Sequence, residues 1–94
     1  MQQIYGIVNV DGKKLSGAGF TASRVSEGKY SISWDQHFAD TPGVQVTTVR
    51  ISDQWYPVDG INLSDVNSSG CMVYTMDSGK NMSNRDFSII AIGD

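Results

Sequence analysis

The chain has 94 residues, of which 39% are hydrophobic and 18% are charged, and its formal net charge is −3 at pH 7. Val and Ile occur seventeen times against two Leu, and Glu27 is the only Glu. Because Leu and Glu favour helices and β-branched residues favour sheets, this composition excludes a helical bundle. The seven basic residues are scattered, which argues against the clustered basic surface of a nucleic-acid-binding protein.

Turn-forming residues divide the chain at intervals of about eight to twelve residues, which is the spacing of an all-β sandwich or barrel. Each turn contains Gly, in most cases after Asp or Ser, and these residues suit tight turns. The turns are Asp11–Gly12, Ser16–Gly19, Ser26–Gly28, Thr41–Gly43, Asp59–Gly60, Ser68–Gly70 and Asp77–Gly79.

Alternating apolar and polar residues between these turns predict seven strands and no helix. The clearest alternation places Tyr30, Ile32 and Trp34 on one face of a strand and Ser31 and Ser33 on the other. We therefore expect residues 1–94 to form a single domain, an antiparallel β-sandwich of about six to seven strands. The predicted strands are Ile4–Val10, Phe20–Val25, Tyr30–Trp34, Val44–Ile51, Trp55–Leu63, Cys71–Met76 and Asp86–Ile92.

Two of the predicted strands, Val44–Ile51 and Asp86–Ile92, carry apolar residues on both faces. In the second of them, Phe87 and Ile89 lie on the face opposite to Ile90. A strand of this kind is either central in its sheet or covered by another subunit. We expect both strands to take part in contacts between the subunits of a homo-oligomer.

Cys71 is the only cysteine, so the chain cannot form an intrachain disulfide. The sequence has no ligand spacing typical of zinc or calcium sites, and we expect neither a metal nor a cofactor. Cys71 is therefore expected to be a buried apolar residue. A small domain without disulfides needs a good two-sheet core or oligomerisation, and we expect both.

His37 is the only histidine and lies in the predicted polar loop 35–41. An Asp–His pair could serve a serine nucleophile, but no nucleophile motif or second acid–base partner is present at a fixed spacing. The sequence therefore favours a protein that is not an enzyme. His37 then either hydrogen-bonds a ligand or a neighbouring subunit, or is an ordinary surface residue.

Trp55 and Tyr56 form the main aromatic cluster and are expected near the edge of a loop. Flat aromatic faces beside fixed polar groups bind sugars, although packing against the edge of the sandwich is the alternative. The segment Asp77–Arg85 is the most polar of the chain. Binding residues usually lie on such loops, so this segment is a second candidate binding region.

No apolar run approaches the 18 residues that a membrane-spanning helix needs, so we expect no membrane insertion. The N-terminal residues lack the charged and apolar regions of a signal peptide. We therefore expect the protein to be cytoplasmic or assembled into a virion or surface particle. The three Asn-x-Ser sequons, at Asn62, Asn67 and Asn81, are expected to remain unglycosylated.

Several segments follow a pattern G-x-G-F-T, G-x-Y-x-I-x-[FW] and F-x-x-x-P-x-V. This pattern resembles small β-sandwich domains of phage tail-fibre and bacterial surface proteins, and the end of the chain is similar to that of the H-type lectins. The resemblance extends over residues 20–93. The segments that carry it are Gly17–Thr21, Gly28–Trp34, Phe38–Thr47, Gly70–Thr75 and Phe87–Gly93.

The resemblance implies a homotrimer in which sugar binds in a groove between subunits, held by Asp, Arg, His and Asn residues of loops. It suggests such a role for Arg50, Asn81 and Arg85. We expect a non-catalytic binding module that recognises carbohydrate or a cell-surface receptor. The alternative is a structural trimerisation domain of a phage or surface particle that binds no ligand.

Overall fold

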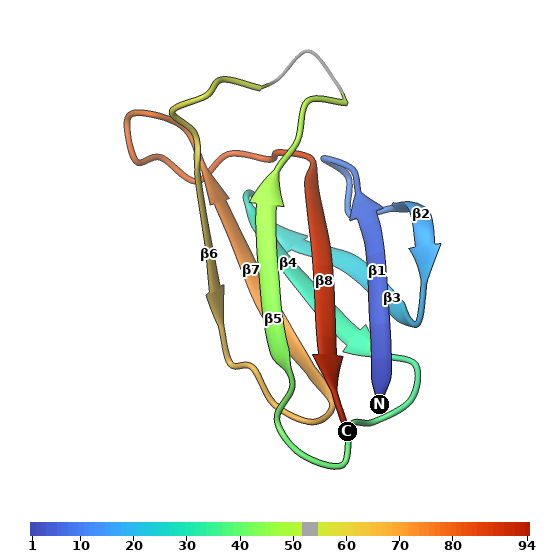
Figure 1. Ribbon diagram of the computed structural model, residues 1–94. Coiled ribbons are helices and arrows are strands. Elements are labelled where there is room, and N and C mark those ends of the chain that lie inside the picture. The colour runs from blue at the N-terminus through green and yellow to red at the C-terminus, as the bar shows by residue number, and fades with distance from the viewer. Residues whose placement is uncertain (52–54) are drawn as a thin grey trace.

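Figure 1 shows the computed structural model of the chain, which describes residues 1–51 and 55–94. The described residues form eight strands and no helix, and the strands make two antiparallel sheets packed against each other. The predicted all-β sandwich is confirmed, with one strand more than expected. The strands are β1 (Gln2–Val8), β2 (Lys14–Ala18), β3 (Phe20–Ser26), β4 (Lys29–Trp34), β5 (Gly43–Thr48), β6 (Gly60–Ser64), β7 (Gly70–Met76) and β8 (Phe87–Gly93).

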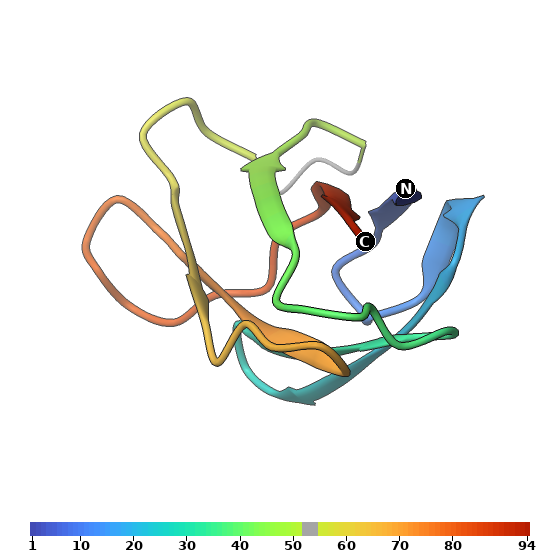
Figure 2. The ribbon, with the colours of Figure 1, turned by 60° about the horizontal axis from the view of Figure 1, so that its bottom comes forward.

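The two sheets have four strands each and form the two layers seen in Figure 2. Sheet A has the strand order β2-β1-β8-β5, and sheet B has the order β3-β4-β7-β6. The first and last strands pair along their whole lengths, from Gln2 opposite Gly93 to Val8 opposite Phe87. Both termini therefore lie at the same end of the sandwich (Figure 1).

Successive strands run in opposite directions, so the connections fall into two groups. The β1–β2, β3–β4, β5–β6 and β7–β8 connections lie together at one end, which we call the loop end (Figure 1). The β2–β3, β4–β5 and β6–β7 connections lie at the opposite end with the two termini. Residues on consecutive connections are thus separated by the length of a strand.

The strand that the sequence analysis missed is β2, where Ser16–Gly19 was expected to be a turn. Gly17 pairs with Gly6 of β1 and has a φ of 97°, a conformation that suits glycine. The pairing of β1 with β2 also shifts register between Ile7 and Val8. β2 is a short edge strand, and its residues do not alternate between apolar and polar. Its sequence therefore cannot be distinguished from that of a turn.

Two predicted strands are shorter than expected. The segment Trp55–Leu63 is strand only from Gly60, because the Asp59 N–H donates to the Tyr56 carbonyl at 3.0 Å and closes a turn. The segment Val44–Ile51 is strand only as far as Thr48.

The expectation of two apolar faces is wrong for β5. Val44 and Val46 pack against the core, whereas the exposed residues between and after them are Gln45 and Thr47. The same expectation is confirmed for β8, where Ile90 remains exposed on the face opposite to the core.

Alternate residues of both sheets form one hydrophobic core. The ring of Tyr30 meets that of Phe87 edge to face, with centroids 5.1 Å apart, and Trp34 meets Phe38 in the same way at 5.7 Å. Cys71 is a buried free thiol, as predicted, and burial raises its pKa to about 12. The thiol therefore stays protonated and packs as an apolar side chain. The buried hydrophobic residues are Ile4, Val8, Phe20, Tyr30, Ile32, Trp34, Phe38, Cys71, Val73, Phe87, Ile89 and Ala91.

The pairing of β2 with β1 leads to a prediction about Gly17. A Cβ atom at this position would collide with the Tyr5 carbonyl oxygen, and the positive φ strains any other residue. We expect Gly17→Ala to lower the free energy of unfolding by about 2 kcal/mol or more in urea denaturation. Gly43→Ala is the matched control, because the nearest atom lies 3.8 Å from its Cβ position. Equal stabilities of the two variants would contradict the prediction.

Candidate functional site

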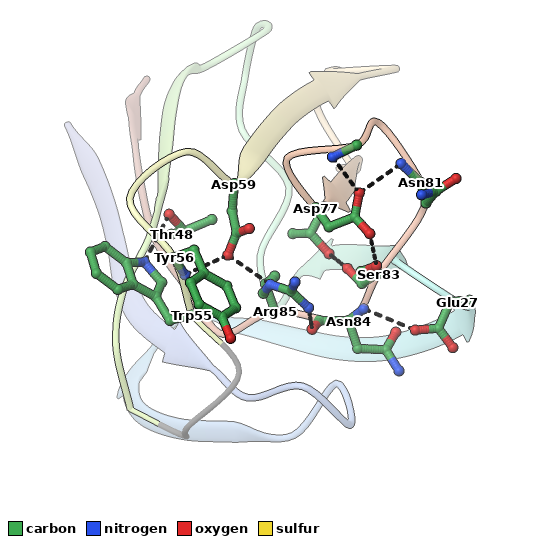
Figure 3. A network of polar contacts seen from close by, with 12 residues as sticks. Glu27, Thr48, Trp55, Tyr56, Asp59, Asp77, Asn81, Ser83, Asn84 and Arg85 are labelled. Atoms are coloured by element: carbon green, nitrogen blue, oxygen red, sulfur yellow. Dashed lines mark hydrogen bonds and ion pairs between the residues drawn. The ribbon is translucent and has the colours of Figure 1, made fainter.

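A buried ion pair joins two loops at the loop end (Figure 3). Arg85 Nε donates to Asp59 Oδ2 at 2.7 Å, and the side chains are 9% and 1% exposed. Asp59 Oδ2 also accepts the Tyr56 N–H at 2.8 Å, and Arg85 Nη1 donates to the Asn84 carbonyl at 2.9 Å. The pair therefore links the β5–β6 loop to the β7–β8 loop. Asp59 Oδ1 is buried and has no hydrogen-bond partner among the described residues.

The residues beside Arg85 tie the remaining two connections to this centre. Asn84 Oδ1 accepts the Gly28 N–H at 2.7 Å. The Asn84 N–H donates to Glu27 Oε2 at 3.0 Å (Figure 3). The residue after Arg85 is Asp86, and its Oδ1 accepts the Val10 N–H at 2.9 Å. All four connections of the loop end are thus held together by the segment 84–86.

Asp77 organises the outer part of the β7–β8 loop. Its Oδ1 accepts the N–H groups of Gly79 at 2.8 Å and of Asn81 at 3.0 Å. Hydrogen bonds to the carboxylate, above all the one from the Asn81 N–H, hold the pKa of Asp77 below its ordinary value. Lys80, between these two donors, has a φ of 65°. The loop is therefore built around an ionised carboxylate.

An open cavity of about 440 Å³ lies between these loops. Glu27 and Asp77 supply carboxylates to its lining, whereas the only cationic side chain there, Arg85, is already paired with Asp59. The lining therefore offers hydrogen-bond acceptors with excess negative charge. The lining residues are Val10, Glu27, Asp77, Ser83, Asn84 and Arg85.

The structure brings most of the predicted site residues to this end. Trp55 is half-buried and its Nε1 donates to Thr48 Oγ1 at 3.2 Å, while the Tyr56 side chain is 60% exposed (Figure 3). Tyr56 rather than Trp55 thus offers an aromatic face to a ligand. Asn81 is exposed in the β7–β8 loop, and Arg85 is the buried partner of Asp59.

Of the six predicted residues, only Arg85 lines the cavity of the loop end. Arg50 is exposed and follows β5 at the loop end. His37 is also exposed, but it belongs to the β4–β5 connection at the end where the two termini lie (Figure 1). Within one subunit, His37 cannot act on the same small ligand as Tyr56.

A smaller cavity of about 260 Å³ lies on the outer side of sheet B, at the other end. Its lining includes Ser31, Ser33 and Asn67, and the Asn67 Oδ1 already accepts the N–H groups of Ser69 at 2.8 Å and Gly70 at 3.1 Å. None of the predicted binding residues lines it. The cavity at the loop end is therefore the stronger candidate.

Sequence reasoning missed Asp59, Glu27 and Asn84 as members of this site. Asp59 was expected only to form a turn, and the ion pair joins it to a residue 26 positions away. Asn84 is 57 positions from Glu27. No local pattern signals contacts of this range. The high polarity of the segment Asp77–Arg85 was the one available signal, and this segment supplies four of the residues that line the cavity.

The described residues contain no group of three His, Cys, Asp or Glu side chains that could hold a metal ion. In the same part of the chain, no helix is long and apolar enough to cross a membrane. Comparison with protein-family models, curated proteins and solved structures returns no significant match. The site must therefore be interpreted from its own geometry.

The ion pair predicts a large effect of Arg85→Met. This variant leaves the Asp59 carboxylate buried without its cation, and we expect a loss of about 3 kcal/mol in the free energy of unfolding. Arg50→Met, at an exposed arginine of the same end, should change stability by less than about 0.5 kcal/mol. Urea denaturation measures both. The double variant Asp59→Leu/Arg85→Met should recover part of the lost free energy of unfolding. If Arg85→Met and Arg50→Met lowered stability by similar amounts, the buried ion pair would be contradicted.

The lowered pKa of Asp77 predicts how the β7–β8 loop responds to acid. Its carboxylate stabilises the loop fully above the unfolded-state pKa of about 3.8, and this contribution is lost as pH falls through the lower folded-state pKa. We expect amide exchange at Gly79 and Asn81, followed by NMR, to accelerate in Asp77→Asn at neutral pH. Asp11→Asn, at an exposed residue of the β1–β2 turn, is the control. Unchanged exchange in Asp77→Asn would show that its carboxylate does not hold the loop.

Proposed function

We propose that this chain is a non-catalytic, lectin-like module that recognises a carbohydrate or a cell-surface receptor through its loop end. The observation that carries the proposal is the open cavity of about 440 Å³ lined by Glu27, Asp77, Ser83 and Asn84. Concave sites with a few convergent polar groups are the usual places for small ligands. The cavity is open to solvent, which suits the binding of a terminal group of a larger molecule.

The polar groups of the cavity match the chemistry of a sugar. Hydroxyl groups of a saccharide donate to carboxylate and amide oxygens, and they accept from hydroxyl and amide N–H groups. The Asn84 side chain is held in place by the Gly28 N–H, so the lining is preorganised in part. The exposed ring of Tyr56, on the adjacent β5–β6 loop, supplies the apolar face against which a sugar ring packs.

The charge of the lining favours a neutral or amino sugar over an acidic one. Glu27 and Asp77 contribute negative charge, and the guanidinium of Arg85 is already neutralised by Asp59. A carboxylated or sulfated saccharide would bring further negative charge into the cavity, which is unfavourable in a partly desolvated site. The net charge of −3 acts in the same direction.

The resemblance to phage tail-fibre and surface domains suggests where such a module works, as a homotrimer within a particle that contacts cells. A structural trimerisation domain without ligand binding is the second candidate function. The exposure of Ile90 and Ile92, at 49% and 44% on β8, favours it, because soluble monomers rarely expose contiguous apolar surface.

Glycan-array binding separates the two functions. For a ligand site at the loop end, we expect saturable binding to neutral or amino sugars, weakened at least about tenfold in Tyr56→Ala, which corresponds to about 1.4 kcal/mol. His37→Ala is the control, because this exposed residue lies at the opposite end. The absence of any saturable binding would favour the structural role. Binding that His37→Ala abolishes and Tyr56→Ala leaves intact would move the site to the other end.

A further inference from the structure

The outer face of sheet A carries an apolar surface across its two central strands. Tyr5 of β1 lies directly opposite Ile90 of β8, and these side chains are 61% and 49% exposed. Ile92, 44% exposed, follows Ile90 on the same face, and Ile7 follows Tyr5. Four apolar side chains therefore form one contiguous patch, which we call the sheet A patch.

The residues around this patch are uncharged. The outward-facing residues on the edge strand β5 are Gly43, Gln45 and Thr47, and those of β2 beside Tyr5 and Ile7 are Ala18 and Ser16. Within the bounds of β1, β2, β5 and β8, no outward-facing residue bears a charge.

Lys14, the one charged residue of these strands, faces the other way. It pairs with Val8, its Nζ lies 5.1 Å from the centre of the Phe20 ring, and it donates to the Phe20 carbonyl at 2.9 Å. The charge is thus held beside the core and away from the outer face. This placement leaves the sheet A patch without a charged partner of either sign.

The outer face of sheet B has a different character. On β3 and β4, Thr21 lies opposite Ser33 and Ser23 lies opposite Ser31. Lys29 of β4 adds a charge, with its Nζ 5.8 Å from the centre of the Tyr74 ring. Val25 of β3 is an exposed apolar residue. The outer face of sheet B thus combines hydroxyl groups and a charge with apolar residues, whereas the strands of sheet A carry no charge on theirs. The absence of charge therefore distinguishes the outer face of sheet A from that of sheet B.

We propose that the sheet A patch is where copies of this chain pack against one another. A partner with a charged surface gains nothing from this face, whereas a second copy supplies an uncharged, apolar surface of the same shape. Each copy carries a net charge of −3, so two copies repel unless they meet where no charge lies. The uncharged face satisfies this condition.

The size of the face sets the strength of the contact. Four strands about 4.8 Å apart, with about six residues of 3.4 Å each, make a face of roughly 400 Å². Two such faces remove roughly 800 Å² from water, which is below the roughly 1,200–2,000 Å² of stable specific interfaces and is typical of weak, transient contacts. We therefore expect assembly that depends on protein concentration. Two copies would enclose the patch about a two-fold axis, and three would enclose it about a three-fold axis.

This inference rests on the assembly part of the proposed function and is independent of sugar binding. The glycan site lies at the loop end, whereas the sheet A patch covers the strands. A monomeric variant that still binds glycan would leave the glycan site intact and confirm that the two surfaces are separate. Loss of glycan binding with unchanged assembly would count against the glycan site alone.

Sedimentation velocity of the full chain from about 1 µM to about 1 mM tests the proposal. We expect the wild-type mass to rise with concentration to a multiple of 10.2 kDa. Ile90→Lys should remain monomeric throughout, because it places a like-charged side chain at the centre of each facing patch. Val25→Lys is the matched control, since Val25 is 56% exposed on β3 of the other sheet, and it should assemble like the wild type.

Two further measurements keep the outcome clear. Circular dichroism verifies that each variant is folded, and Tyr5→Lys repeats the test from the neighbouring strand if Ile90→Lys does not fold. A wild-type protein that stays monomeric at the highest concentration would overturn the proposal. A folded Ile90→Lys variant that assembles as the wild type does would overturn it as well.

Discussion

The ion pair between Asp59 and Arg85 holds together the end of the sandwich at which the candidate site lies. Removing two charges from water costs several kcal/mol per ion, and their attraction offsets this cost only while both partners stay in place. The neighbours of Arg85 then fix the other connections, because Asn84 contacts Gly28 and Glu27 while Asp86 contacts the β1–β2 turn. A change at Arg85 therefore displaces the walls of the cavity as well as the loops themselves.

The fold was predictable where alternation and turn chemistry agree. Tyr30, Ile32 and Trp34 identified β4 because each second residue enters the core. The prediction failed where backbone pairing, rather than side-chain burial, makes the strand. β2 contributes Gly17 and exposed residues to the sheet, so its sequence contains no buried face to detect. Likewise, the apolar run Val44–Ile51 did not reveal that the strand ends at Thr48.

The candidate site was predictable only in part. The polarity of Asp77–Arg85 and the aromatic pair Trp55–Tyr56 indicated two loops, and the fold places both at the loop end. That these loops meet could not be predicted, because the contact depends on a hydrogen bond across 26 residues. The separation of His37 from Tyr56 was not predicted, because it depends on the ends of the sandwich to which their loops belong. The six-residue strand β5, about 20 Å long, lies between the two loops.

The first and last strands of the chain are neighbours in the middle of sheet A, and both termini leave from the same end. Tension applied between the termini therefore loads the β1–β8 ladder one pair at a time, from Gln2 and Gly93 toward Val8 and Phe87. A ladder loaded in this way opens like a zipper, at lower force than one whose hydrogen bonds are sheared together. A pull applied through one terminus alone does not load this ladder, so the way in which force reaches the chain decides how much of it the fold withstands.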